Sequence, residues 1–457
     1  MATPATATGD RRAGYRALLR TPGAWRFLIP GFLARQPIAM LGVGTVLLVE
    51  HTTGSYAAAG IVTAVSGVSM ALLAPQGGRL TDRFGQGAVL VPLVLLHALS
   101  VSLLIALALR GAPVWALFAA AVPAGATIPQ ISPMVRARWS ARLGGAERTA
   151  GTNDAGGSGG SSLMTTAAAF ESVTDEFSFI VGPVLATALC TGVHPAAGLV
   201  AEVALMLCSG LLFAAQRGTQ PEVRTGGGGG TSGRGKGRRG EGSGRRAGSA
   251  LGVRGMRVLI VVLLGIGTVF GGMQVSVAAF TQAAEAPELN GVLYGVFAAG
   301  NTSAALVVGT VRWRRSADVR LLTAYPVLVL AALTLAVTAQ LAPLLPLLGG
   351  LGLLLGLWVA PSMITGFTLA ELLVPAAFRT EAFTWLTGAV ALGQASGSMV
   401  AGQLADAAGA GAGFLAPLAG TGLALAALVV FRRRLAVGTG DGSSGGAVGH
   451  RPPVPVD

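Results

Sequence analysis

Four ionisable residues lie inside stretches of the chain that are otherwise almost entirely apolar. Arg35 falls in the first such stretch, and the acids Glu171, Asp175 and Glu176 fall in the fifth. An ionisable side chain near the centre of a bilayer costs ~2.5–3.5 kcal/mol, so it usually faces a cavity or a charged partner. A carboxylate in such a place can carry a proton, and a nearby arginine lets a conformational change switch its protonation.

The spacing of these residues predicts which of them meet. Glu171 and Asp175 share one helix face, whereas Glu176 points ~100° away from it. At 1.5 Å per residue, Arg35 lies roughly 14 Å into its span, at a depth similar to Asp175. We therefore expect Arg35 to pair with one of these acids. Two interpretations stay open: a proton or charge relay formed by all four residues, and a static ion pair that joins two helices. For Glu171 there is a third, a solvated place at the cytoplasmic interface.

The elements that position these charges are membrane helices. The chain is 52% hydrophobic and only 11% charged, with a mean hydropathy of +0.67, against ~25% charged residues in soluble domains. Each bilayer crossing needs ~20 mostly apolar residues. We therefore predict an all-α integral membrane protein with twelve transmembrane helices, over 26–49, 55–76, 88–109, 113–135, 165–190, 196–215, 257–281, 291–311, 321–340, 343–367, 381–405 and 413–431.

The distribution of the net charge of +13 along the chain predicts how the chain is oriented in the membrane. With both termini in the cytoplasm, of 32 lysines and arginines only Arg110 lies in an outer loop and only Arg35 lies well inside a span. This is the positive-inside bias of a multi-pass protein of the cell (inner) membrane. It argues against nucleic acid as a partner and leaves membrane lipids, bound without specificity by the basic clusters.

Composition also divides the chain. We predict a cytoplasmic tail over 1–25 and a six-helix bundle over 26–215. A Gly-rich, basic segment without apolar periodicity follows over 216–255 and is typical of a flexible cytoplasmic linker. A second six-helix bundle covers 256–431, and the tail over 432–457 is expected to be disordered. A cytoplasmic loop is expected over 151–162.

The segment between the second and third spans reads Gly78-x-Leu80-x-Asp82-Arg83-x-Gly85 and is predicted to be a loop. It resembles the signature loop of major facilitator superfamily transporters, and the plan of six plus six spans is similar to theirs. The resemblance implies two bundles around a central cavity that opens alternately to either side. It assigns Asp82 to the cytoplasmic start of the eleventh span, beside Glu381, where it closes the gate. Gly78, Arg83 and Gly85 complete these gating residues.

Gly182-Pro183 in the fifth span resembles the antiporter motif of drug-exporting facilitators. Proline removes a backbone donor and kinks a helix. The resemblance is partial, because Leu185 and Ala186 stand where that motif has glycines, and the fourth span lacks the arginine of drug exporters.

Several other polar residues within the predicted spans are weaker candidates for a functional role. The candidate substrate-cavity residues are Gln36, Gln130, Gln274, Asn301 and Trp358. Each has an alternative role in hydrogen bonding or packing between helices. His97 is read mainly as a hydrogen-bonded structural residue, with proton transfer as the alternative. Cys190 and Cys208 are read as small apolar residues. The glycine runs lack the Gly-Lys-Ser/Thr ending of a phosphate loop, and we predict no metal, no cofactor and no enzymatic activity.

These features together predict a monomeric secondary transporter. The expected function is efflux of a small organic molecule, coupled to protons, by alternating access. A proton-coupled uptake symporter is the first alternative. A membrane sensor of facilitator-like fold that does not transport is the second.

Overall fold

The computed structural model describes residues 18–149, 158–220, 250–310, 315–341, 344–375 and 379–435, and within them all regular secondary structure is helical. The predicted all-α fold is confirmed. The α-helices of the first half are α2 (Ala24–Leu33), α3 (Gln36–Thr53), α4 (Tyr56–Phe84), α5 (Gln86–Leu109), α6 (Val114–Ala126), α7 (Ile131–Thr149), α8 (Ser158–Gly192) and α9 (Ala197–Ala215). Those of the second half are α10 (Arg254–Ala283), α11 (Asn290–Thr310), α12 (Ala317–Leu341), α13 (Leu345–Leu373), α14 (Arg379–Ala408) and α15 (Leu415–Val430).

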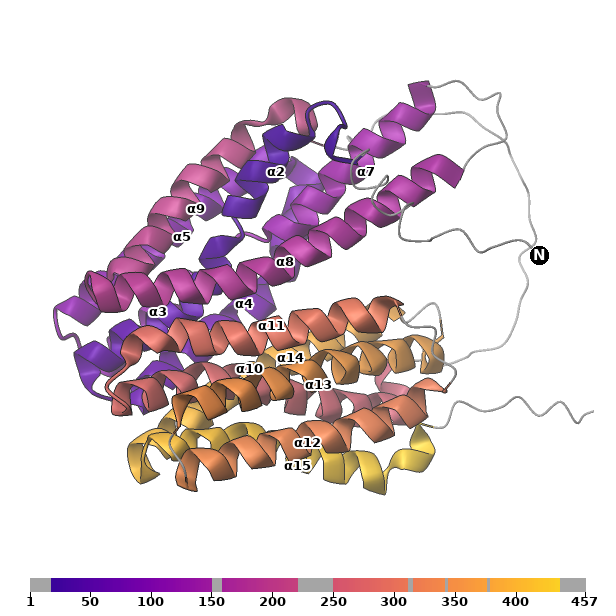
Figure 1. Cartoon of the computed structure of the whole chain (residues 1–457). Helices are drawn as coiled ribbons and strands as arrows, with labels where there is room; N and C mark the ends of the chain where they lie inside the picture. Colours follow the sequence, from indigo (N-terminus) through magenta and orange to yellow (C-terminus); the bar gives the residue numbers. More distant parts are fainter. Residues whose placement is uncertain are drawn as a thin grey trace, which may run out of the picture.

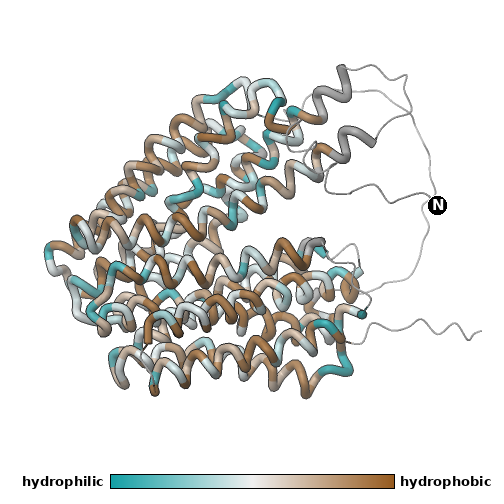
Figure 2. Tube along the Cα trace, in the orientation of Figure 1, coloured by the Kyte–Doolittle hydropathy of each residue, from teal (hydrophilic) through white to brown (hydrophobic). Residues whose placement is uncertain are grey.

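The described helices supply 11 segments that are long and apolar enough to cross a membrane. Helix α14, with 30 residues, runs beside them but carries more polar residues. Hydrophobic residues occur along the helices of both bundles (Figure 2). Many large apolar side chains, such as those of Leu72, Leu99 and Leu423, are exposed on the outside of the bundles, as is expected of helices that contact lipid. The chain is a multi-pass membrane protein with about twelve membrane-spanning segments.

Two of the spans are broken near their middle. The first consists of α2 and α3, separated at Ala34 and Arg35, with Pro37 at the start of α3. The fourth consists of α6 and α7, and the proline at 129 stands in the break between them. Prolines remove backbone donors, so these places suit a helix interruption. Both breaks lie beside the charged residues described below.

The helices form two bundles, each with its own buried apolar core. One core is formed mainly by helices α2 to α9 and the other by helices α10 to α15. Four buried residues of the second half, Val275, Ala278, Ala401 and Ala416, join the first core. Figure 1 shows the two bundles meeting at one end and diverging toward the other. The closest pairs across the boundary are α4 with α14 and α8 with α11. The end where the bundles meet contains the start of α4 and the end of α14. We call it the outer end, because the positive-inside bias of the sequence predicts that it faces away from the cytoplasm.

Two predicted loops are helical in their described parts, and residues 151–157 of the second lie outside the described residues. Helix α4 continues through the signature segment to Phe84, and only Gly85, with φ of 88°, separates it from α5. A positive φ is the conformation that glycine adopts without strain. Helix α8 begins at Ser158, inside the loop expected over 151–162. The distal parts of both predicted tails and most of the predicted linker lie outside the described residues.

Candidate functional site

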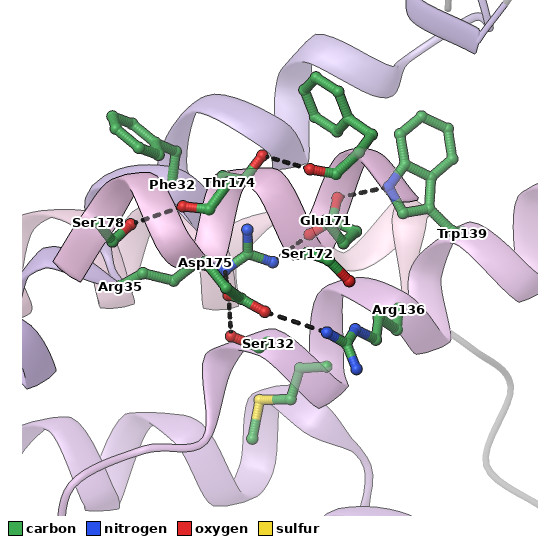
Figure 3. Close-up of polar contacts among 12 residues, drawn as sticks. Phe32, Arg35, Ser132, Arg136, Trp139, Glu171, Ser172, Thr174, Asp175 and Ser178 are labelled. Atoms are coloured by element: carbon green, nitrogen blue, oxygen red, sulfur yellow. Dashed lines mark hydrogen bonds and ion pairs between the residues drawn. The ribbon is translucent and has the colours of Figure 1, made fainter. Parts of the chain in front are cut away.

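Arg35 lies at the break between α2 and α3 and is buried, with 4% of its side chain exposed. Its guanidinium forms an ion pair and hydrogen bond with Oε2 of Glu171 in α8 (Figure 3). Glu171 is fully buried, and its Oε1 accepts a hydrogen bond of 2.7 Å from the indole Nε1 of Trp139 in α7. Both oxygens of this carboxylate are therefore held by donors, which is the condition for burying an ion pair without a large penalty.

Asp175 lies one turn further along α8 and extends the cluster. Its Oδ1 is 3.1 Å from Nε of Arg35, but that N–H makes no hydrogen bond, so the contact is ionic. Ser132 donates a hydrogen bond of 2.6 Å to Oδ1, and Arg136 pairs with Oδ2 at 3.1 Å. Arg136 is 51% exposed. The cluster thus connects a fully buried carboxylate, through Arg35, to one that reaches the surface of the bundle.

Glu176 is separate from this cluster. It faces α11 in the other bundle, where Thr302 donates a hydrogen bond of 3.2 Å to its Oε2. The amide of Asn301 lies 3.5 Å from the same oxygen. Among the expected relay residues, the structure therefore brings Arg35, Glu171 and Asp175 together and places Glu176 at the boundary between the bundles.

A pocket of about 80 Å³ lies at this boundary, and we call it the central pocket. Its described lining contains no charged side chain. The hydroxyls of Thr45 and Thr63 are buried without a hydrogen-bond partner, so they have bonding capacity left for a ligand. The polar side chains that line the pocket are Thr45, Thr63, Ser66, Gln274, Tyr294 and Gln394.

Of the expected cavity residues, only Gln274 lines the central pocket. Gln36 donates a hydrogen bond of 2.8 Å to Ser178 within the first bundle. Gln130 lines a separate pocket beside α4. Asn301 contacts Glu176, and Trp358 lines a separate groove between α11, α12 and α13.

The Gly182-Pro183 pair packs against its neighbours within a continuous α8. A Cβ at Gly182 would lie 2.6 Å from the Cβ of Ala39, so glycine is what lets α3 and α8 approach. Pro183 has no N–H, so the carbonyl of Phe179 has no helical partner. Both Phe179 and Pro183 line the central pocket.

At the outer end, Asp406 of α14 caps the start of α4. Its carboxylate accepts hydrogen bonds from the hydroxyl of Ser55 at 2.7 Å and from the backbone N–H groups of Tyr56 and Ala57 at 2.9 Å each. A Cβ at Gly402 would lie 2.1 Å from the carbonyl oxygen of Tyr56, so glycine is required for this approach. An acidic side chain at a helix N-terminus satisfies free N–H groups and favours the helix dipole.

Sequence reasoning missed Asp406, although a signal was present. Gly402-x-Leu404-x-Asp406 repeats the pattern Gly78-x-Leu80-x-Asp82. Each copy stands in the last turns of a helix, α14 in one case and α4 in the other. The two helices are neighbours, and they run in opposite directions, because Tyr56 lies against Gly402 and Gly60 lies against Ser398. The pattern therefore occurs at both ends of one helix pair.

The copy in α4 is less closely packed at its glycine. The side chain of Asp82 lies outside the described side chains, and Arg83 is exposed. A Cβ added at Gly78 would meet no atom within 4 Å. Glu381 lies in the first turn of α14, and the adjacent Arg379 lies 3.6 Å from Glu371 of α13.

Two further polar clusters join helices within the first bundle. His97 lies 2.8 Å from Oε1 of Glu202 and 2.9 Å from the carbonyl oxygen of Ala124, which connects α5, α9 and α6. The buried Arg138 donates hydrogen bonds to Gln86, Thr219 and the carbonyl of Phe213, at 2.8, 2.9 and 2.9 Å. Both arrangements favour a structural role. Within the described residues, no group of three or more His, Cys, Asp or Glu side chains could hold a metal ion.

Comparison with known proteins gives a consistent result. The family model described as Major Facilitator Superfamily matches residues 27–351. A mutant of the nucleoside transporter NupG is similar in structure, with a TM-score of 0.65, 13% identity, and 90% of this chain and 99% of that chain covered. A bacterial homologue of the iron transporter ferroportin, in an inward-facing state, has a TM-score of 0.61, 16% identity, and coverages of 90% and 98%.

A D-xylose-proton symporter has a TM-score of 0.57 and 14% identity, with 89% of this chain and 97% of that chain covered. At such identities the likeness concerns the fold alone. No curated protein sequence matches the chain.

Proposed function

The chain belongs to the major facilitator superfamily, and we propose that it is a proton-coupled transporter that exports a small organic molecule. The observation that carries this proposal is the buried cluster of Arg35, Glu171 and Asp175. Apolar side chains of similar volume often join two helices as well as a buried ion pair does, so packing alone does not require these charges. A cluster that connects a buried carboxylate to a partly exposed one has a use when protons enter and leave.

The coupling follows from competition for Arg35. With both carboxylates ionised, Arg35 stays between them. Protonation of Asp175 removes one of its two ionic partners and leaves Glu171, which Trp139 also holds. Because Arg35 stands at the break between α2 and α3, a change in its partners acts on the joint between these two helices. Asp175 is the proton acceptor in this scheme, and Arg35 transmits the change.

The substrate site is the central pocket. Both bundles contribute to its lining, so the relative movement of the bundles changes its shape and access. In this conformation the bundles meet at the outer end, and we assign it as open toward the cytoplasm. The orientation rests on the positive-inside bias. The uncharged lining of hydroxyls and amides favours a neutral molecule with several hydrogen-bonding groups. Export, rather than uptake, rests on the likeness of Gly182-Pro183 to the antiporter motif.

The test is proton movement in inverted vesicles that contain the purified protein. A preset pH gradient is monitored while neutral and charged small molecules are added one at a time. We expect a subset of neutral compounds to dissipate the gradient with the wild-type protein and not with Asp175→Asn. Asp318→Asn is the matched control, because Asp318 lies in the first turn of α12, away from the cluster. Equal dissipation by wild type and Asp175→Asn would remove Asp175 from the coupling.

A further inference from the structure

A groove of about 880 Å³ lies between α11, α12 and α13. We call it the α12 groove. Much of its wall is apolar and includes Val307 of α11, Val327 of α12 and Trp358 of α13. The transport cycle proposed above makes no use of it, because it belongs to the second bundle alone.

The groove opens on the side of α11 that is turned away from the substrate path. Tyr294 of α11 lines the central pocket, whereas Ser303 of the same helix lines the groove. At roughly 100° per residue, the separation between these two positions amounts to half a turn around the helix. Val307, in the groove wall, is 58% exposed. In a bilayer this side of the bundle contacts lipid.

The charged side chains in the described lining of the groove are all positive. Its charged lining residues are Arg315, just before α12, and Arg320, in the first turns of α12. Among the polar residues, Ser303 and Thr323 add hydroxyl groups. The N-terminus of a helix also favours negative charge. Along α12 the groove extends roughly 10 Å from Arg320 to Val327, at 1.5 Å per residue. It therefore combines a cationic mouth at the membrane surface with an apolar wall inside the membrane.

The corresponding place in the first bundle lacks these charges. There, a groove of about 530 Å³ lies between α4, α5 and the broken span of α6 and α7. Its described polar lining consists of the amides Gln76, Gln86 and Gln130 and the hydroxyl of Thr81, without an arginine. The cationic mouth is thus a property of the second groove and not a consequence of the bundle architecture.

We propose that the α12 groove binds an anionic phospholipid. The phosphate lies against Arg315 and Arg320, and one acyl chain lies along the wall formed by Val307, Val327 and Trp358. Basic pockets between membrane helices on the cytoplasmic side suit anionic headgroups, and each arginine near the surface contributes about fivefold in binding. A zwitterionic lipid gains little there, because its own cation opposes the two arginines.

The proposal is tested by native mass spectrometry of the full-length protein, titrated with phosphatidylglycerol or with phosphatidylcholine of the same acyl chains. We expect phosphatidylglycerol to bind more tightly, and Arg315→Gln with Arg320→Gln to weaken it roughly 25-fold. Val307→Trp, which fills the groove and keeps both arginines, should also weaken it. The matched control is Arg433→Gln, because Arg433 is exposed beyond α15 at the same membrane face and lies outside the groove.

Three results would overturn the proposal. One is equal binding of the two lipids, and another is an effect of Arg433→Gln as large as that of the double substitution. The third is displacement of phosphatidylglycerol by glycerol phosphate at equal concentration, which would assign the arginines to a water-soluble anion. Because binding is read directly, neither success nor failure depends on the transport activity proposed above.

Discussion

The contact between Asp406 and the start of α4 gives the sharpest prediction. If it holds the outer end closed, Asp406→Ala should shift the protein toward the outward-open state. Removing a side-chain cap costs about 0.5–2 kcal/mol, and loss of the charge at the helix N-terminus costs about 0.3–1 kcal/mol. These terms overlap, and Ser55 still caps Ala58 at 3.1 Å within α4. We therefore expect about 1–2 kcal/mol, or a roughly 5- to 30-fold change in the equilibrium.

The shift can be read from the accessibility of the central pocket. A cysteine at position 45, in a chain with Cys190→Ala and Cys208→Ala, reports the pocket because Thr45 lines it. In intact cells, a thiol reagent that cannot cross membranes reaches it only while the outer end is open. Its labelling rate should rise roughly 5- to 30-fold with Asp406→Ala and less with Asp406→Asn, which keeps one acceptor oxygen.

Controls separate opening of the outer end from general loosening. Glu285→Gln, at an exposed acid of the same membrane face, should leave the rate unchanged. In inside-out vesicles, Asp406→Ala should lower the rate of labelling or leave it unchanged. An outer labelling rate within twofold of the wild type, or rates that rise equally from both sides, would refute the assignment of Asp406 to the outer closure.

Three further predictions concern binding and stability. Arg35→Met leaves the buried carboxylate of Glu171 without its ionic partner, whereas Asp175 keeps Arg136. It should destabilise the protein by about 3–5 kcal/mol in thermal unfolding, with much of the loss recovered when Glu171→Met is added. Equal loss in both variants would contradict a paired role. Thr45→Ala combined with Thr63→Ala should weaken substrate binding about tenfold or more. Thermal unfolding should be nearly unchanged, because these hydroxyls have no protein partner. A loss of stability without a loss of binding would assign the two hydroxyls to packing. Arg138→Met should lower the free energy of unfolding by about 3 kcal/mol or more, because it removes three hydrogen bonds from a buried cation. Arg142→Met removes one hydrogen bond at the surface and should lower it much less.

The fold was predictable because the bilayer restricts the backbone to a few kinds of structure. Every membrane helix needs a long apolar stretch, so hydropathy located the spans closely. The signature segment was harder to assign. Its glycines and charges indicated a loop, yet the backbone of α4 stays helical to Phe84 because one positive φ at Gly85 is enough to reverse the chain. The residue types in this segment predict that it is exposed to water, but they do not predict the residue at which the helix ends.

The site was predictable only in part. Depth and spacing indicated that Arg35 and the acids of the fifth span lie near each other. Arg136 and Trp139 were not indicated, because the arginines of α7 lower its hydropathy and the predicted span therefore ended at residue 135. Ser132 lies inside that predicted span, and its hydroxyl alone did not indicate a partner. The hydroxyls of Thr45 and Thr63 gave no signal either, because threonine in a helix commonly bonds its own backbone. Only packing shows that these two do not.

The central claim is that proton movement through the cluster of Arg35, Glu171 and Asp175 drives export. The most direct test is flux of a labelled substrate in proteoliposomes with an imposed pH gradient of either sign. The account predicts that substrate moves against the direction of protons and reverses when the gradient is reversed. It also predicts that Asp175→Asn keeps substrate exchange without any response to pH. Substrate that moves in the same direction as protons would establish symport, and flux indifferent to the gradient in the wild-type protein would contradict proton coupling altogether.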